Sequence, residues 1–173
     1  VPDKNTSKGM AGGGITTDTL VALVNDAKES VVIQTPYLVT TELGQQLFAN
    51  AVKRGVKVQI MTNSLGSTDN LPAFSGYARD RHKLLDAGIE IYEYRPDAAI
   101  RRKIMTSSMV QDSQEFPVFG IHAKTMVIDR KVLMVGTFNL DPRSANLNTE
   151  CITIMHSDPL AQSVLQLMIE EMK

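Results

Sequence analysis

The residues with the clearest chemical potential lie in the stretch HAKTMVID, residues 122–129. Side chains alternate between the two faces of a β-strand, so this stretch, taken as a strand, predicts His122 and Lys124 on one face and Asp129 on the other. The lysine supplies a fixed positive charge, and the imidazole can donate, accept or attack near neutral pH. The pair indicates a site for an anionic ligand, although one His and one Lys at this spacing also occur by chance.

Small hydrogen-bonding residues follow this stretch. The segment GTFN, residues 136–139, combines a glycine that permits a tight backbone with the hydroxyl group of Thr137 and the amide of Asn139, groups that suit phosphate oxygens. Glu150 begins a further predicted strand, where its carboxylate could hydrogen-bond the far nitrogen of His122 and fix its tautomer. The predicted phosphate site therefore consists of these three residues and the His–Lys pair.

The overall composition sets wide limits. A chain of 173 residues with 43% hydrophobic content can form one compact core but barely two, which predicts a single domain. Lys and Arg total 18 and Asp and Glu total 19, so no positive excess indicates nucleic acid or an anionic membrane. One cysteine cannot form an internal disulfide, and the three histidines have no metal-type spacing, so the chain carries no zinc signature. No apolar run approaches the roughly 20 residues that span a bilayer, so any membrane contact is expected to be peripheral.

The beginning of the chain differs from the rest. It starts with Val1 and continues through the polar, glycine-rich DKNTSKGMAGGG. We interpret residues 1–14 as a flexible linker or cut point, and the chain as a piece of something longer. The expected single domain then covers residues 15–173.

The elements that must position the site follow from hydrophobic periodicity and turn signals. Helices are predicted at 16–30, 40–55, 73–87 and 158–173. Strands are predicted at 31–35, 56–62, 89–94, 121–129, 132–138 and 150–156. The alternation of helix and strand up to residue 94 predicts parallel strands with helices packed on the sheet. The expected fold class is α/β, with a mixed, largely parallel sheet flanked by helices on both faces.

A long excursion without a clear pattern runs from residue 95 to residue 120. Long ordered loops in compact domains are often functional. This one contains the basic cluster Arg101, Arg102 and Lys103 next to apolar residues. The favoured interpretation is a solvated helical turn, and the alternative is a contact with a phosphate or a lipid headgroup.

The motifs together resemble a known family. HAKTMVID fits the H-x-K-x(4)-D signature of the phospholipase D superfamily, and GTFN follows at that family's usual offset as G-[ST]-x-N. The tail NLDPRSANLNTE resembles the N-x-D-x-R-S-x(3)-N-x-E segment of bacterial cardiolipin synthases and their phospholipase D-like relatives. The stretch VVIQTPYLVTTELGQQLFANAVKRGVKVQIMTNS is similar to these enzymes too, so the resemblance covers nearly the whole chain from about Thr16. It favours the lipid-transferring branch over the nuclease branch.

The resemblance implies a role for each matching residue. His122 would be the catalytic imidazole. Lys124 and Asn139 would bind the phosphoryl oxygens, assisted by Thr137, where many members have Ser. Glu150 resembles the acidic residue that orients the imidazole.

Four further residues would support the site. Asp129 would mainly be a structural salt-bridge partner, which agrees with its opposite strand parity. Asp141 and Arg143 would brace the loop under the site, and direct substrate contact by Arg143 is the less favoured alternative. Tyr37 follows the end of a strand, where ligands of parallel sheets gather. It could line the pocket, but a core or rim aromatic is the favoured interpretation.

The chemistry of the family requires a second histidine. Its members cleave phosphodiesters without metal: one imidazole attacks phosphorus to form a phosphohistidine, and another protonates the leaving oxygen and later activates the acceptor. Because attacker and leaving group lie on opposite sides of phosphorus, one imidazole cannot serve both. His82 and His156 begin no H-x-K motif and are expected to be structural or surface residues. The chain is therefore expected to hold half an active site.

Two arrangements would complete that site. The favoured one makes this chain the C-terminal half of a two-motif enzyme, with His122 as the general acid/base. In the other, two copies of a single-motif chain pair across a two-fold axis. Either the upstream half or the second copy is thus an expected partner.

The resemblance implies a metal-free transphosphatidylase without cofactors. It would act at the cytoplasmic side of a bacterial membrane, take a phosphatidyl group from phosphatidylglycerol or a similar phospholipid, and pass it to another lipid to give cardiolipin. Water as acceptor would instead give phospholipase activity. A homodimeric phosphodiesterase or nuclease would be expected to have a more basic surface. An inactive half-domain for assembly or lipid binding is the remaining alternative.

Overall fold

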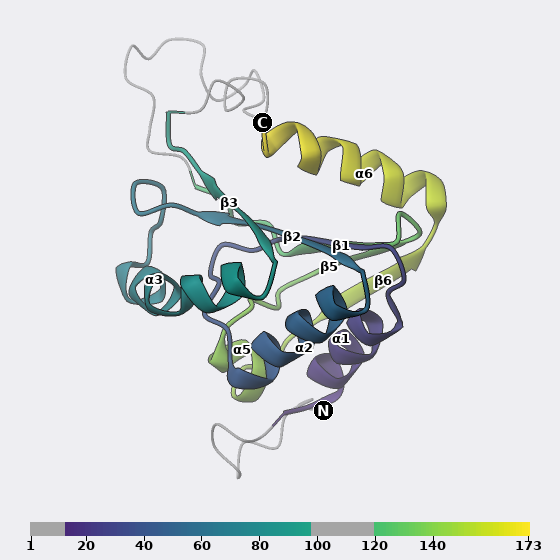
Figure 1. The fold of residues 1–173 in the computed structure, drawn as a ribbon, viewed down its shortest axis with the longest axis horizontal. Helices are drawn as coiled ribbons and strands as arrows, with labels where there is room; N and C mark the ends of the chain where they lie inside the picture. Colours follow the sequence, from purple (N-terminus) through teal and green to yellow (C-terminus); the bar gives the residue numbers. More distant parts are fainter. Residues whose placement is uncertain (1–12, 98–119) are drawn as a thin grey trace.

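The computed structural model describes residues 13–97 and 120–173, and Figure 1 shows the path of the chain. The strands are β1 (Ser30–Gln34), β2 (Lys57–Asn63), β3 (Glu90–Tyr94), β4 (Thr125–Ile128), β5 (Val132–Gly136) and β6 (Ile152–His156). The helices are α1 (Ile15–Asp26), α2 (Glu42–Lys53), α3 (Leu71–Asp86), α5 (Pro142–Asn146) and α6 (Asp158–Glu171). The strands form a six-stranded sheet in the order β3-β2-β1-β4-β5-β6.

The sheet is mixed. β1 pairs with β2, and β2 with β3, in parallel, as the alternation of helix and strand predicts. The second half is an antiparallel meander, in which β4 pairs with β1, β5 with β4 and β6 with β5. β1, β2, β3 and β5 thus point one way, and β4 and β6 point the other way. The predicted mixed α/β class is confirmed, but the sheet is not largely parallel, since only two of its five adjacent pairs are. The reason is that β4, β5 and β6 follow one another without intervening crossover helices that would make them parallel.

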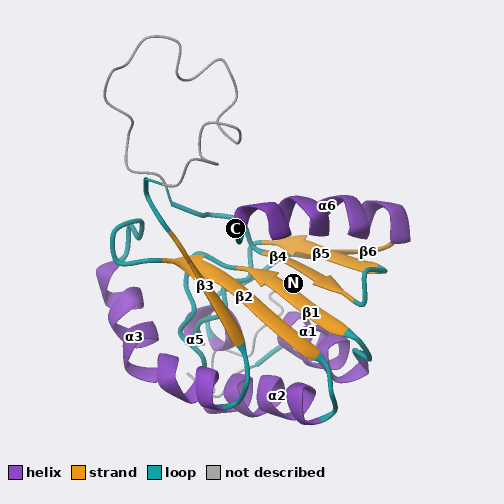
Figure 2. Ribbon diagram, turned by 45° about the horizontal axis from the view of Figure 1, so that its top comes forward, coloured by secondary structure: helices purple, strands orange, loops and turns teal. Residues whose placement is uncertain are grey.

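Helices cover both faces of the sheet, as predicted. In Figures 1 and 2, α6 lies alone on one side, whereas α1, α2, α3 and α5 lie on the other. The larger core cluster joins α1, α2 and α3 to the inner residues of the sheet. A second cluster packs Ala161, Leu165 and Met168 of α6 against Val32 and Val127. Since successive strand residues face opposite ways, Val127 belongs to one core while its neighbour Met126 belongs to the other.

Local signals explain where most helices begin. The side chain of Thr41 caps α2 by accepting a hydrogen bond from the N–H group of Gly44, 3.1 Å away, as the sequence predicts. α1 differs, because its N-cap is Gly14 and no side chain caps it. The five-residue helix α5 was not expected from the sequence.

The strand predicted at residues 121–129 is shorter than expected. β4 begins only at Thr125, which pairs with Gln34, the last residue of β1. Beyond that point β1 offers no further strand residue as a partner. The backbone of Ile121 instead binds the side chain of Asn63. His122 and Lys124 therefore lie in the segment that leads into β4.

Two predictions lie outside the described residues. They are the linker at the beginning of the chain, of which residues 1–12 are not described, and the basic cluster Arg101, Arg102 and Lys103. Among the helices that the structure describes, none has both the length and the apolar character needed to cross a membrane.

Candidate functional site

The candidate site lies at one end of the sheet, where β1 and β5 finish and β4 and β6 start. Thr125 of β4 pairs with Gln34 at the end of β1 and with Val135 near the end of β5. Gly136, the last residue of β5, pairs with Ile152, the first residue of β6. The segments that carry the predicted site residues therefore meet at this end, which we call the site end and which can be followed in Figure 2.

The imidazole of His122 is exposed to solvent and has an aromatic neighbour. The ring of Tyr37 meets it edge to face, with 6.5 Å between the ring centroids and 80° between the planes. The hydroxyl group of Tyr37 donates a hydrogen bond to Oδ1 of Asp69 at 2.9 Å. Burial and the bond to Asp69 raise the pKa of the Tyr37 hydroxyl, so the tyrosine stays protonated. Tyr37 thus lies beside the candidate catalytic residue.

The backbone that leads to His122 is held by Asn63, a residue that is not among the predicted site residues. The Asn63 side chain is 3% exposed. It accepts a hydrogen bond from the N–H group of Ile121 at 2.7 Å and donates one to its carbonyl at 2.9 Å. Next to this clamp, a Cβ atom on Gly120 would lie 2.3 Å from the carbonyl oxygen of Ser67. A glycine and an asparagine 57 residues apart in sequence thus fix the position of the histidine.

Lys124 is only partly exposed and turns toward the same segment. Its Nζ donates a hydrogen bond to the carbonyl oxygen of His122 at 2.9 Å. Burial lowers the pKa of the Lys124 ammonium group, and the carboxylates of Glu150, Asp69 and Asp141 oppose that effect without cancelling it. A desolvated cation with further hydrogen-bonding capacity suits an anionic oxygen.

The carboxylate of Glu150 accepts hydrogen bonds from the side chains of Thr137 and Asn148. The hydroxyl group of Thr137 donates a hydrogen bond to Oε2 of Glu150. Nδ2 of Asn148 donates one to Oε1 at 3.3 Å. The Thr137 hydroxyl also accepts from the N–H group of Cys151 at 3.0 Å. The structure therefore places this carboxylate with Thr137 and Asn148, and its hydrogen bond to His122 remains a prediction.

A glycine makes the close approach of β5 and β6 possible. A Cβ atom at Gly136 would lie 2.2 Å from the carbonyl oxygen of Cys151. The next residue, Thr137, donates its backbone N–H to that same carbonyl at 2.9 Å. The glycine of GTFN is therefore required by packing, and it sets the position of the Thr137 hydroxyl relative to Glu150.

Asn139 has a buried acceptor atom that no other described residue uses. Its backbone N–H donates to Oγ of Ser144 at 3.2 Å, and Ser144 is fully buried. Its side-chain oxygen Oδ1 is buried and has no hydrogen-bond partner among the described residues. Buried polar atoms are rarely left unpaired, and exceptions often mark ligand sites.

Asp141 caps the short helix α5, which follows Asn139 and contains Arg143. The carboxylate of Asp141 caps this helix and accepts a hydrogen bond from the N–H group of Ser144 at 2.7 Å. The backbone carbonyl of Arg143 accepts hydrogen bonds from Leu147 and Asn148, while its side chain is exposed. The contact of Asp141 is of the bracing kind that the resemblance implies, whereas the role of the Arg143 side chain remains a prediction.

The loop that carries Tyr37 is tied to the loop that carries Asn139. The N–H group of Val39 donates to the carbonyl of Leu140 at 2.8 Å. The N–H group of Leu140 donates to Oγ1 of Thr35 at 3.4 Å. Residues about 100 positions apart are thereby held in one unit, so the N-terminal part of the chain contributes to the site as well.

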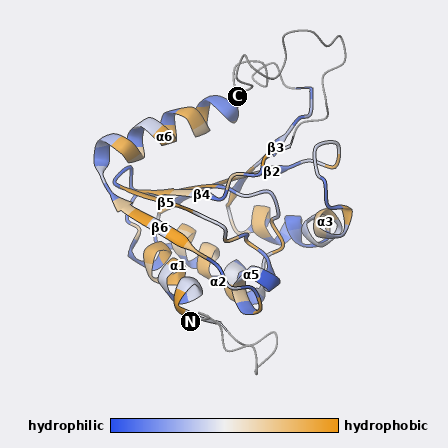
Figure 3. Ribbon diagram, turned by 180° about the vertical axis from the view of Figure 1, so that it is seen from behind, coloured by the Kyte–Doolittle hydropathy of each residue, from blue (hydrophilic) through white to orange (hydrophobic). Residues whose placement is uncertain are grey.

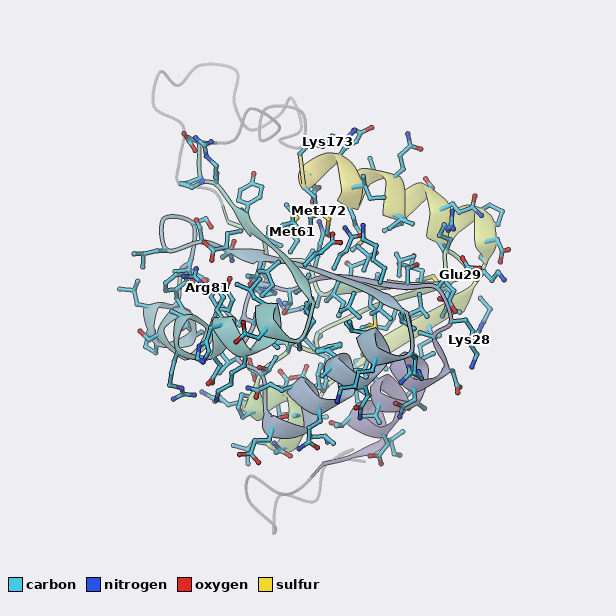
Figure 4. All side chains as sticks on the ribbon, viewed as in Figure 1. Lys28, Glu29, Met61, Arg81, Met172 and Lys173 are labelled. Atoms are coloured by element: carbon cyan, nitrogen blue, oxygen red, sulfur yellow. The ribbon has the colours of Figure 1, made fainter. Side chains whose placement is uncertain are left out.

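Asp129 lies at the other end of β4, away from the site. Its carboxylate accepts hydrogen bonds from the N–H groups of Lys28, Glu29 and Ser30 at 2.9, 2.8 and 2.9 Å. Figure 4 labels Lys28 and Glu29 at this margin of the molecule. Burial raises the pKa of the Asp129 carboxyl, but the three N–H donors outweigh it, so the pKa is lowered overall. Among the described residues its hydrogen-bond partners are backbone groups, and the charge of Lys131 lowers the pKa further. The salt bridge that the resemblance implies remains a prediction.

The two other histidines lie away from the site. His156 ends β6 and pairs with Val132 at the opposite end of the sheet. His82 lies 11 residues into α3, about 16 Å along a helix from its start near the site end. Both side chains are exposed. The site end therefore contains a single imidazole of this chain.

The fold defines an α/β protein in which one histidine, one lysine, one glutamate and several uncharged hydrogen-bonding groups gather at one end of the sheet. The chain belongs to the family described as cardiolipin synthase, phospholipase D-like domain, whose model matches residues 20–172. The predicted family is thereby confirmed.

Two curated relatives show the extent of the match. Cardiolipin synthase C of Escherichia coli K12 is 37% identical over 145 residues, which are 84% of this chain and 30% of the relative. Cardiolipin synthase 2 of Staphylococcus epidermidis is 30% identical over 151 residues, 87% of this chain and 26% of the relative. The chain thus spans less than a third of the length of either relative.

Solved structures share the fold at low sequence identity. Nuc from Salmonella typhimurium, a phospholipase D family member, superposes with a TM-score of 0.64 at 21% identity and covers 92% of this chain and 87% of its own. Phosphatidylserine synthase from Haemophilus influenzae gives a TM-score of 0.65 at 16% identity, over 92% of this chain and 36% of its own. The predicted phospholipase D-like fold is confirmed by these similarities.

Proposed function

We propose that the chain is one half of a phosphatidyltransferase of the phospholipase D type, similar to cardiolipin synthase, which acts on phospholipid phosphodiesters by metal-free phosphohistidine chemistry. The observation that carries this proposal is the site end, where the segments that carry one imidazole, one partly buried ammonium group and the side-chain amide of Asn139 meet. Family membership supports the substrate class. The single imidazole supports the view that another half completes the site.

In the proposed reaction the chain binds the phosphate and moves a proton. Lys124 pairs with a non-bridging phosphate oxygen, and the amide N–H groups of Asn139 donate to another. His122 donates its proton to the leaving oxygen while the imidazole of the other half forms the phosphorus–nitrogen bond. His122 then takes a proton from the acceptor hydroxyl, whose oxygen displaces that imidazole from phosphorus.

The tyrosine and the carboxylate at this end would position those groups. Tyr37 borders the imidazole, and Asp69 holds the tyrosine hydroxyl. Glu150 organises Thr137 and, in the loaded site, is proposed to orient His122. Asp129, Asp141 and Arg143 act through the backbone segments that they brace.

The proposed partner is a second H-x-K half, supplied by the same longer polypeptide. The proposed domain is residues 15–173, and its proposed location is the cytoplasmic side of the membrane, in peripheral contact with lipid. A second possibility is a single-motif homodimeric phosphodiesterase, nuclease or phospholipase. It is favoured by the match to Nuc over 87% of that chain, which shows that the fold can form a whole chain of about this size.

The test replaces the histidine in the protein that contains both halves. His122→Ala is expected to abolish formation of cardiolipin from phosphatidylglycerol vesicles, measured by mass spectrometry. His156→Ala removes an exposed histidine at the opposite end of the sheet and is the matched control, expected to keep activity. Turnover that survives in His122→Ala would overturn the catalytic assignment.

The products and a chelator separate the remaining alternatives. Cardiolipin with release of glycerol indicates transfer, whereas phosphatidic acid indicates hydrolysis. Turnover is expected to persist in excess EDTA, and complete loss that added metal restores would contradict the metal-free mechanism.

A further inference from the structure

A cavity of about 540 Å³ lies between α1, α2 and the sheet. Its walls include Leu20, Val21 and Val24 from α1 and Leu47 and Phe48 from α2. Figure 3 shows hydrophobic residues along these two helices, which lie side by side beneath the sheet. The volume falls within the roughly 300–1,000 Å³ of ligand pockets, which are lined mainly by apolar side chains.

The cavity borders the phosphate site through shared residues. Phe138 and Leu140, on either side of Asn139, line it from the loop after β5. The same two residues, with Met126, also line a small space that Lys124 reaches from the site end. A ligand whose phosphate lies against Lys124 and Asn139 therefore has an apolar chamber behind the same loop.

The charges around the cavity limit what can occupy it. The carboxylate-bearing residues Asp18 and Glu42 line it and are exposed, so they border its opening. They would repel the carboxylate of a free fatty acid. They would not repel a hydrocarbon chain that belongs to a lipid whose phosphate is held at Lys124.

We propose that this cavity, between α1 and α2, binds one acyl chain of the phosphatidyl group. The inference rests on the proposed function and adds the place where the tail of the substrate is bound. Thr40 and Thr41, which line the cavity from the α2 cap, offer hydroxyl groups to the ester region of the lipid. Burial of the chain supplies the apolar binding energy, while the site end contacts the phosphate.

The first experiment locates the chain without requiring turnover. Phosphatidylglycerol with a diazirine near the end of one acyl chain is incorporated into vesicles and irradiated with the protein. Mass spectrometry of the digested protein then gives the labelled residues. Labels are expected on α1 and α2, at or next to Val21 and Leu47. Labels only on α6, or none at all, would overturn the proposal.

A pair of variants tests the cavity itself. Val21→Trp puts a large ring into the cavity, whereas Ala22→Trp puts the same ring on the exposed side of the same helix. Losing burial of about two methylene groups weakens binding roughly tenfold, so labelling in Val21→Trp is expected to fall by about that factor. Ala22→Trp is expected to label normally. Equal labelling in both variants would contradict the proposal. Circular dichroism is the control that checks whether both variants are folded.

Two further measurements separate this inference from the function on which it rests. Hydrolysis of bis(p-nitrophenyl) phosphate, a diester without acyl chains, is measured in the protein with both halves. This hydrolysis is expected to be the same in Val21→Trp as in the unsubstituted protein. If the unsubstituted protein does not hydrolyse the diester, the proposed function is contradicted, and the labelling experiment still decides whether the cavity binds an acyl chain. Hydrogen exchange of α1 and α2 tests for a polypeptide occupant. Full protection before lipid is added, with no label afterwards, would show that protein fills the cavity.

Discussion

Burial and neighbouring negative charge shift the pKa of the Lys124 ammonium group in opposite directions. Burial lowers its pKa, and the carboxylate of Glu150 is the largest of the charges that raise it again. The balance leaves a cation that has lost part of its water but keeps a hydrogen bond to the carbonyl of His122. Such a group gains more from a phosphate oxygen than a fully hydrated lysine does, because less water must be removed on binding.

The titration of Lys124 should show this balance directly. We expect its midpoint, followed by NMR of ¹³C-labelled lysine and assigned with Lys124→Arg, to lie below the ordinary value of about 10.4. Glu150→Gln removes a negative charge that raises the pKa, so the midpoint should fall further. A midpoint that stays the same or rises in Glu150→Gln would show that Glu150 does not act on this group.

Asp129 binds three backbone N–H groups at the start of β1, and its replacement should cost stability without touching the site. Asp129→Ala leaves those donors unpaired and puts alanine at a φ of 50°, so we expect a loss of about 1–3 kcal/mol in the free energy of unfolding. Asp129→Asn keeps an acceptor and tolerates that backbone conformation, so it should lose less. Urea denaturation at pH 7 measures both.

The pH dependence of that loss follows from the lowered pKa of the Asp129 carboxyl. The stabilisation is present above the unfolded value of about 3.9 and disappears as pH falls through the lower folded value. The difference between Asp129→Asn and the unsubstituted chain should therefore shrink below pH 4. A difference that is constant from pH 7 to pH 3 would show that the charge of Asp129 contributes nothing.

At the scale of elements, the four longer helices and the first three strands were predictable from sequence because their signals are local. Thr41 caps α2 in the structure, and Gly55 and Gly88 close helices at φ of 89° and 87°, as glycine C-caps do. The strand predicted at residues 121–129, which includes His122, was predicted too long, because apolar alternation cannot show where β1 stops pairing.

The remaining differences involve contacts between distant parts of the chain. The hydrogen bonds between Asn63 and Ile121 join residues 58 positions apart, so no local sequence pattern predicts them. An asparagine directly after a buried strand was the available signal. The residue types of the site were recognisable from HAKTMVID and GTFN, whereas the engagement of Glu150 by Thr137 and Asn148 requires the pairing of β5 with β6.

Two glycines in different elements give a matched prediction about packing. Gly136→Ala forces a Cβ atom against the carbonyl of Cys151, and we expect a loss of about 1–3 kcal/mol in stability together with lower activity, because β5 and β6 must separate. Gly44→Ala in α2 meets no atom closer than 3.5 Å and should gain about 0.5–1 kcal/mol. Thermal unfolding of the two variants compares them, and a stable, fully active Gly136→Ala would contradict the role given to β5–β6 contact.

At the scale of the whole molecule, the single imidazole at the site end predicts that the chain alone cannot complete the proposed two-histidine reaction. We expect the 173-residue chain to sediment as a monomer and to show no turnover of bis(p-nitrophenyl) phosphate, because no second imidazole faces His122. Turnover should appear when a second H-x-K half is supplied. A stable dimer with activity of its own would instead establish the two-fold arrangement, and analytical ultracentrifugation with a parallel assay distinguishes the outcomes.

The strand order has a consequence for how the chain is made. β1 lies in the middle of the sheet, yet its second neighbour, β4, begins only at Thr125, 91 residues after β1 ends. During synthesis the parallel half can therefore assemble while one side of β1 still has open backbone groups, which are sites for aggregation. Contacts of such long sequence separation also slow folding. The candidate site is thus completed last, when the C-terminal meander docks onto β1.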